Sequence, residues 1–219
     1  SNFYDYDRNG PIGGYGFDYL EEISNYTGWN YEYVPVSWDR GLEMLKTGEI
    51  DLLAPAPMTP VLHRQFEYSE REVGLNYAVL CVAVENTETA FNDFDAINGT
   101  KVGILKGAPF NSNLKDFEKA NGFRVETVSY ANQAALLKAL HDGKVEAILT
   151  SSLEKRPTER IIAKFAPTPY YFIAEKGRRD IMGPLNAALA SIKESNPYFD
   201  YELQKKYYNW DEYSVPVFT

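Results

Sequence analysis

The sequence predicts an α/β fold that is divided into two lobes. Helical and extended hydrophobic patterns alternate along the 219 residues, which favours mainly parallel sheets flanked by helices. One complete α/β block, residues 85–167, is preceded and followed by strands, as an inserted lobe would be. With 44% hydrophobic and 24% charged residues, the composition is that of a soluble globular protein. The longest apolar run, residues 77–84, has the length of a strand and not the roughly 18 residues of a membrane span.

The residues before the block predict helix, strand, helix and strand in turn. Apolar residues at helical spacing predict a helix over about 16–26 that ends at Gly28. Residues 31–36 alternate as a strand does. Trp38, Leu42 and Leu45 recur at i, i+4 and i+7 and predict a second helix, which ends at Gly48. A short buried strand is then expected over residues 50–54.

The block repeats this alternation. Strands are expected at residues 101–105, 124–128, 146–149 and about 160–165. Phe110, Leu114 and Phe117 predict a helix that ends at Asn121-Gly122. The alanine- and leucine-rich residues 131–140 predict another, closed by Asp142-Gly143, and a short helix is expected near residues 152–157.

The chain after the block begins with a Pro-Thr-Pro step at residues 167–169 and an aromatic strand at residues 170–174. A long amphipathic helix follows, carried by apolar residues from Ile181 to Ile192 and broken at Pro197. A last helix is expected over about 199–208.

This layout predicts that residues 1–84 and 168–219 form lobe 1, and that residues 85–167 form an inserted lobe 2. The chain would cross between the lobes twice, and two crossings make a hinge. Small-molecule ligands prefer the cleft between two such lobes.

Charge and reactive residues exclude several classes of function. The net charge is −9, and residues 85–167 hold 11 acids and 11 bases, so the rest of the chain carries the whole excess. Such a surface repels phosphate backbones, and we expect no nucleic-acid partner. The one cysteine, Cys81, lies in the apolar run and is expected in the core. The two histidines, His63 and His141, do not fall in a metal-binding motif, so no metal, cofactor or catalytic residue is predicted.

The order of several segments carries a resemblance to a known family. These are Gly16-Phe-Asp-Tyr-Leu, Gly48-Glu-Ile-Asp-Leu, Met58-Thr-Pro, Phe66-Glu-Tyr-Ser and, in the block, Asn98-Gly-Thr-Lys-Val-Gly-Ile-Leu-Lys-Gly. In this order they resemble the cluster-3 extracellular solute-binding proteins over nearly the whole chain. The resemblance implies a two-lobed periplasmic-binding-protein type II fold, an extracytoplasmic location, and amino-acid binding without catalysis.

A narrower resemblance concerns the receptor context. The Gly48-Glu-Ile-Asp-Leu-Leu and Pro197-Tyr-Phe segments are similar to sensor modules outside the membrane in bacterial diguanylate cyclases and histidine kinases. The tail from Val215 to Thr219 resembles a linker to a further module or membrane segment. This narrower resemblance implies an extracytoplasmic sensor that is tethered to the membrane only through segments outside this chain. The alternative is the solute-binding protein of an amino-acid-type ABC transporter.

The positions that hold the ligand in the family have changed character here. The carboxylate-binding arginine falls on Leu62, with Arg64 two positions late, and the acid that pairs with the amino group falls on Ser151. Aromatic contacts are expected from Trp38 and from Tyr4 or Tyr6. The resemblance places the remaining ligand-site positions at Ala54, Pro55, Pro57, Met58 and Thr59 in lobe 1, and at Gly107, Ala108 and Pro109 in lobe 2.

Without these partners, burying a zwitterion would leave two charges unpaired at several kcal/mol each. We therefore expect a small-molecule ligand that is not a standard free α-amino acid bound in the usual mode. A degenerate module that binds nothing is a further alternative. An enzyme, as in cyclohexadienyl-dehydratase-like or lytic members, would need an acid or base in the cleft. The candidates for such a group are Glu67, Glu70 and Arg64, and none of them falls at a position where a catalytic acid or base is expected.

Overall fold

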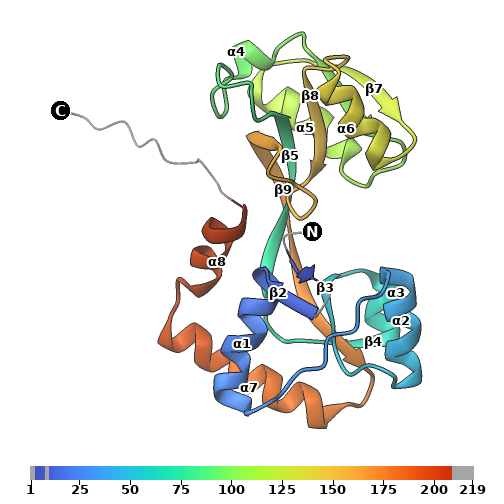
Figure 1. Ribbon diagram of the computed structural model, residues 1–219, viewed down its shortest axis with the longest axis vertical. Coiled ribbons are helices and arrows are strands. Elements are labelled where there is room, and N and C mark those ends of the chain that lie inside the picture. Colours follow the sequence, from blue (N-terminus) through green and yellow to red (C-terminus); the bar gives the residue numbers. More distant parts are fainter. Residues whose placement is uncertain (1–2, 8–9, 209–219) are drawn as a thin grey trace, which may run out of the picture. The chain divides into compact units, whose positions relative to one another are not determined.

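The computed structural model describes residues 3–7 and 10–208, and its elements divide between two compact units (Figure 1). Unit 1 lies within Ser1–Leu75 and Thr168–Tyr207, and unit 2 comprises Asn76–Pro167 together with Tyr208. Two strands, β5 (Gly74–Ala83) and β9 (Glu159–Glu175), run from one unit into the other. The α/β class is confirmed. The lobe boundaries at 84/85 and 167/168 stay a prediction.

Unit 1 begins with a small antiparallel pair, β1 (Asp5–Asp7) and β2 (Gly10–Gly13). Helix α1 (Tyr15–Thr27) follows and ends at Gly28, whose φ of 71° is left-handed, as glycine permits. Helix α2 (Trp38–Thr47) ends in the same way at Gly48. Both helices are close to the predicted ones, because terminal glycines mark helix ends reliably.

The sheet of unit 1 is small, and β9 is its centre. Strand β3 (Leu53–Pro57) pairs antiparallel with β9 on one side, and β4 (Phe66–Tyr68) also pairs with β9. The short helix α3 (Pro60–Gln65) connects β3 to β4. The predicted strand at residues 50–54 therefore starts three residues later than expected and includes two prolines. An edge strand accepts prolines because one of its sides needs no N–H donors.

One predicted strand of unit 1 is absent. Residues 28–37 form neither helix nor strand, so the prediction for residues 31–36 is wrong. Alternation in the sequence describes which faces the side chains prefer, but a strand also needs a neighbour that exchanges hydrogen bonds with it.

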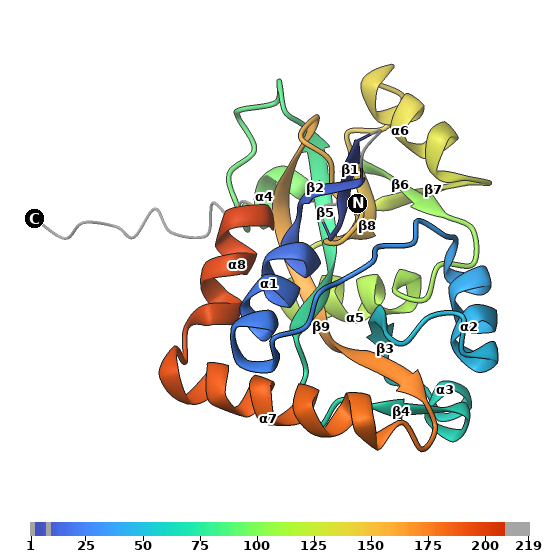
Figure 2. The ribbon, with the colours of Figure 1, turned by 60° about the horizontal axis from the view of Figure 1, so that its bottom comes forward.

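Two helices complete unit 1. Helix α7 (Arg179–Ser195) buries a row of apolar residues and packs beside α1, and α8 (Phe199–Tyr208) begins where predicted (Figure 2). Polar contacts join α8 to α1, because Asp18 accepts hydrogen bonds from Lys206 Nζ at 2.7 Å and from the Tyr207 hydroxyl at 2.6 Å. Tyr19 donates another to Asp200, at 2.6 Å.

We expect Asp200→Asn to stabilise the protein at neutral pH. Burial raises the pKa of Asp200, although the Tyr19 hydrogen bond acts in the opposite direction. A raised carboxyl pKa gives stability that is complete below the unfolded value of about 3.9 and is lost as pH rises through the folded value. Asparagine keeps the acceptor oxygen and never ionises.

Thermal denaturation of both proteins between pH 3 and 8 measures this effect. A change of about 1 kcal/mol in the free energy of unfolding shifts the melting temperature by about 2–4 °C. The melting temperature of Asp200→Asn should exceed that of the wild type at pH 7, and the gap should close near pH 3. A constant gap across the range would contradict this account of Asp200.

Unit 2 is a three-layer α/β unit. Its parallel strands are β6 (Lys101–Leu105), β7 (Glu126–Tyr130) and β8 (Ala147–Ser151), with β6 between the other two. Strand β5 pairs antiparallel with β8 and is also a neighbour of β9. A one-turn helix, α4 (Phe94–Ile97), precedes β6. Strand β7 starts two residues later than predicted.

Successive residues of β5 face opposite sides of this sheet, and a different helix covers each side. Leu80 and Val82 belong to the core cluster that includes Leu114 of helix α5 (Asn111–Asn121). Val79 and Cys81 belong to the cluster with Leu136 of helix α6 (Gln133–His141). Cys81 is fully buried, as predicted, and burial raises the pKa of its thiol.

The helix predicted near residues 152–157 is absent, because these residues form turns and loop. The strands expected at about 160–165 and at 170–174 are confirmed as extended chain, and the structure joins them into one strand, β9, which continues through Pro167 and Pro169. Because β9 changes units at Pro167, its prolines stand where the strand passes from one set of neighbours to another.

Candidate ligand-binding site

Three predicted ligand-site positions of unit 1 lie at the end of β3 and in the link to α3. After Pro57 the chain passes through Met58, which is 44% exposed, to Thr59. Thr59 caps α3, since its Oγ1 accepts a hydrogen bond from the Leu62 amide at 3.2 Å. Pro60 fits the first position of α3, where no N–H is needed. The Thr59 hydroxyl oxygen therefore accepts a hydrogen bond within α3, and its O–H group can donate one to a ligand.

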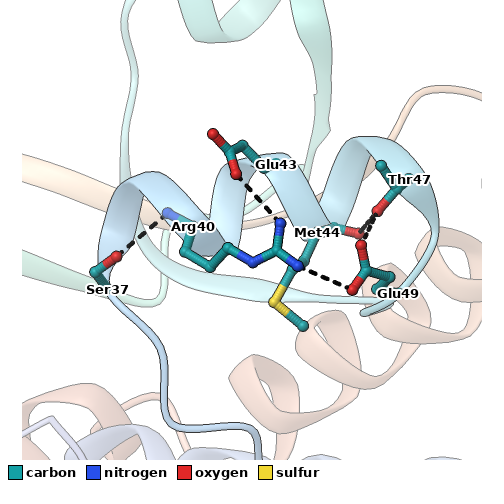
Figure 3. Close-up of polar contacts among 6 residues, drawn as sticks. All are labelled: Ser37, Arg40, Glu43, Met44, Thr47 and Glu49. Carbon is teal, nitrogen blue, oxygen red and sulfur yellow. Dashed lines mark hydrogen bonds and ion pairs between the residues drawn. The ribbon is translucent and has the colours of Figure 1, made fainter.

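Trp38 is the first residue of α2, and its side chain is 36% exposed. The Ser37 hydroxyl oxygen caps the helix by accepting from the Arg40 amide at 3.4 Å (Figure 3). The Arg40 guanidinium bonds Glu43 and Glu49, each at 3.2 Å, which ties the helix to the chain beyond its end. The Ser37 cap therefore satisfies a backbone N–H in the first turn of α2, which begins at Trp38.

Leu62 and Arg64 lie on opposite sides of α3. Leu62 packs against the unit 1 core cluster of Leu45, Ala56, Phe66 and Ile173. Two residues further along a helix is a rotation of about 200°, so Arg64 points away from this core, and it is exposed. The position that the resemblance assigns to a carboxylate-binding arginine thus holds a leucine that supports the fold.

The other predicted residues of β3 offer few donors. Ala54 is 8% exposed, and Pro55 and Pro57 carry no N–H.

In unit 2, the predicted residues lie at one edge of the sheet. Strands β6 and β8 are parallel neighbours, so the chain beyond both of their carboxyl ends reaches the same edge. Gly107, Ala108 and Pro109 form the turn after β6, where Gly107 has a φ of 77°. The Asn111 side chain donates a hydrogen bond to the Leu105 carbonyl at 2.7 Å and closes this turn.

Ser151, at the end of β8, is engaged within the protein. It is 7% exposed, and its hydroxyl donates a hydrogen bond to Asn76 Oδ1 at 2.6 Å. The hydroxyl of Ser152 donates to the same atom at 3.1 Å. The side chain at the position of the expected amino-group partner is therefore neutral and already bonded.

A cavity of about 440 Å³ lies in unit 1, and sequence reasoning did not anticipate it. Tyr4 and Ala54 line it, whereas Trp38, Met58 and Thr59 do not. The Tyr4 ring meets Phe3 edge-on at 4.7 Å and approaches Tyr33 at 6.2 Å between ring centroids. For Tyr6 the structure describes the backbone, which pairs with Pro11.

Most of the cavity wall comes from two stretches of consecutive residues, 29–34 and 49–54. The alternation of residues 31–36 was the available signal in the sequence. Alternation of this kind does not distinguish a paired strand from an unpaired stretch that lines a cavity.

Other kinds of site find little support in the described residues. Within residues 3–7 and 10–208, no three His, Cys, Asp or Glu side chains gather closely enough to hold a metal ion. No helix in the same part of the chain is both long and apolar enough to cross a bilayer. His141 contacts the buried Glu159 at 3.2 Å, and His63 packs beside Tyr68.

Solved structures show the same fold. Substrate-binding domain 2 of Lactococcus lactis GlnP, in an open conformation, has a TM-score of 0.73 at 14% identity, covering 94% of this chain and 90% of its own. The Bacillus subtilis probable amino-acid ABC transporter binding protein ytmK gives 0.73 at 16%, covering 97% and 94%. A reconstructed ancestral cationic amino acid binding protein gives 0.71 at 20%, covering 95% and 91%.

No curated protein matches the sequence. A family model, that of the bacterial extracellular solute-binding proteins, family 3, matches residues 2–209. This match spans nearly the whole chain, and the structural neighbours are two-lobed periplasmic-binding proteins of type II. The chain therefore belongs to the bacterial extracellular solute-binding proteins of family 3.

Proposed function

We propose that this chain binds a small organic solute outside the cytoplasm, and that the solute is not a free α-amino acid held by the usual pair of charges. The observation that carries the proposal is the state of the two expected charge partners. Leu62 is partly buried and packs against the core cluster of unit 1, and Ser151 is neutral and bonded to Asn76. A buried carboxylate or ammonium without a partner costs several kcal/mol.

Three exposed apolar side chains of unit 1 suggest what the solute offers instead. Trp38, Met58 and Val61 are exposed apolar groups, 36%, 44% and 54% exposed respectively. An aromatic or aliphatic portion of the solute would pack on them, and the Thr59 hydroxyl would provide one hydrogen bond. In this proposal the edge of unit 2 at Gly107, Ala108 and Pro109 closes on the solute from the other side. Because the closed state would bind the solute more tightly than the open state, binding would favour the closed state.

A sensor role is our first proposal for what this binding achieves. The chain would be the extracytoplasmic module of a membrane-bound signalling protein, and solute binding would change the relative position of the two units. β5 and β9 would transmit that change, since each strand passes from one unit to the other.

A transport role is the second candidate, and the comparisons favour it. The similar structure from Bacillus subtilis is described as a probable amino-acid ABC transporter extracellular-binding protein. A free or lipid-anchored solute-binding protein would deliver its solute to a permease. The natural protein distinguishes the two roles: a cytoplasmic signalling domain in the same polypeptide supports the sensor, and reconstituted uptake with a permease supports transport.

A thermal-shift screen tests the binding proposal. The panel should contain aromatic acids, nucleosides, short peptides and neutral amides, each at 1 mM to 10 mM, which is about the range that detects weak ligands. We expect at least one compound outside the amino acids to raise the melting temperature. If every class fails, the chain is a structural module that binds no small solute.

Trp38→Ala is expected to weaken the best solute by about 10-fold or more, which is about 1.4 kcal/mol, because a stacked indole contributes this much. Isothermal titration measures the loss. Tyr198→Ala is the matched control, because Tyr198 is an exposed aromatic residue (69%) beyond α7. Equal effects of the two substitutions would remove Trp38 from the binding site.

A further inference from the structure

A second, smaller cavity lies in unit 1, among α1, α7 and α8 and beside the link that follows β4. Its volume is about 50 Å³, and the three helices around it lie side by side in Figures 1 and 2. A single buried water needs about 10–15 Å³, so the cavity has room for about three or four non-hydrogen atoms of a ligand. None of its lining residues belongs to the candidate ligand site described above.

Part of the cavity wall is apolar and aromatic. Leu189 and Ile192 of α7 line the cavity, and each is 2% exposed. Tyr19 of α1 and Phe199 of α8 also line it, and their rings meet edge-on at 5.0 Å between centroids. Aromatic rings attract cations, and aliphatic side chains favour contact with short alkyl groups. This part of the wall therefore suits a small organic cation.

Asp200, in the first turn of α8, gives the same cavity a carboxylate. The residue is half-buried, and its Oδ1 accepts the hydrogen bond from the Tyr19 hydroxyl at 2.6 Å. Among the residues that the structure describes, Tyr19 is the only hydrogen-bond partner of this carboxylate, so Oδ2 is available. Burial raises the pKa of Asp200, which is the response of a carboxylate that is withdrawn from water without a cation beside it.

Three further charged residues surround the opening of the cavity, and all three are exposed. Lys193 lowers the pKa of Asp200 through its positive charge, and Glu72 raises it through its negative charge. Arg71 lines the cavity as well. In the described chain neither base forms an ion pair with Asp200. The acid thus lies further inside than the bases, and the interior of the cavity favours a cation over an anion.

We propose that this cavity is a second binding site, which takes a small primary alkylammonium ion such as methylammonium or ethylammonium. The ammonium group would donate a hydrogen bond to Asp200 Oδ2, and its charge would replace the cation that the carboxylate lacks. The alkyl part would contact Phe199, Leu189 and Ile192. The site is separate from the one proposed for the solute, so either can exist without the other.

Occupation of the cavity would strengthen the attachment of α8. The bound ion would contact α7 and α8 at once, and Asp200 would keep its hydrogen bond to Tyr19 of α1. Because the ion neutralises a partly buried charge, it would stabilise the folded protein over the unfolded chain, in which Asp200 is hydrated.

Thermal denaturation at pH 7 tests the proposal, with methylammonium chloride compared with potassium chloride at the same concentration. With a dissociation constant of about 10 mM, methylammonium at about 100 mM should raise the melting temperature by about 3 °C or more over the potassium salt. tert-Butylammonium chloride, which carries the same charge on a bulkier group, should give no such rise. An equal rise with both amines would contradict binding inside the cavity.

Asp200→Asn should lose the response to methylammonium, because asparagine keeps an acceptor for Tyr19 but carries no charge. The matched control is Asp18→Asn. Asp18 also joins α1 to α8, but it is already paired with Lys206 at 2.7 Å and does not line the cavity, so this variant should keep the response.

Three results would overturn the proposal. The first is a wild-type protein that does not respond to methylammonium, including the case in which only Lys193→Ala responds because Lys193 itself serves Asp200. The second is an equal response of the wild type and Asp200→Asn. The third is loss of the response in both Asp200→Asn and Asp18→Asn, which would assign the effect to the docking of α8 in general.

Discussion

Gly14→Ala is expected to destabilise unit 1 by about 2–5 kcal/mol, because it adds both backbone strain and overpacking. Gly14 precedes α1 with a φ of 116°, which residues with a Cβ rarely adopt. An added Cβ would lie 2.4 Å from the Phe3 carbonyl oxygen and 2.9 Å from the Tyr4 Cα. These are backbone atoms, so they cannot move aside as a flexible side chain would.

The neighbouring residue provides the control for this prediction. At Gly13 an added Cβ meets nothing within 4 Å, and the φ angle is not in the left-handed region. Gly13→Ala should therefore change the free energy of unfolding by no more than about 0.5 kcal/mol. Urea denaturation of both variants measures the difference. Similar losses at the two positions would show that the close approach of Phe3 to Gly14 is not formed.

Asn76→Leu is expected to cost about 2–4 kcal/mol through the loss of one acceptor atom. Asn76 Oδ1 accepts hydrogen bonds from Ser151 and Ser152, whose side chains are 7% and 0% exposed. Leucine would leave both buried hydroxyl groups without this acceptor, at about 1–3 kcal/mol each.

A double-mutant cycle separates this loss from a general packing defect. When Ser151→Ala is added to Asn76→Leu, one donor disappears with its acceptor, and part of the stability should return. Denaturation of the two single variants and the double variant gives the coupling energy. Strictly additive losses would mean that Ser151 is not held by Asn76 and is available to a ligand.

Much of the fold could be predicted from the sequence because its signals are local. The helices that end at Gly28, Gly48 and Gly122 were placed to within about two residues, since glycine allows the left-handed geometry at their ends. The strand predicted at residues 31–36 failed because its partner is not specified by its own side chains. The strand predicted at residues 50–54 lies three residues further along, at Leu53–Pro57. It includes Pro55 and Pro57, which a strand accepts at the edge of a sheet, and the sequence alone does not show which strand is at the edge.

The candidate site shows the same division. The sequence identifies Leu62 and Ser151 as departures from the family, but it does not reveal what these residues do instead. The structure shows Leu62 packed against the core cluster of unit 1. It shows Ser151 bonded to Asn76, which is 75 positions away in the chain. Contacts between distant segments also create the cavity between residues 29–34 and 49–54, which no local pattern defines.

Direct titration of the protein with each of the 20 common amino acids at pH 7 is the sharpest test of the central claim. The account predicts that none binds with a dissociation constant below about 1 mM, since Leu62 and Ser151 replace both charge partners of a zwitterion. An amino acid that binds with a dissociation constant of about 10 µM or less would contradict it.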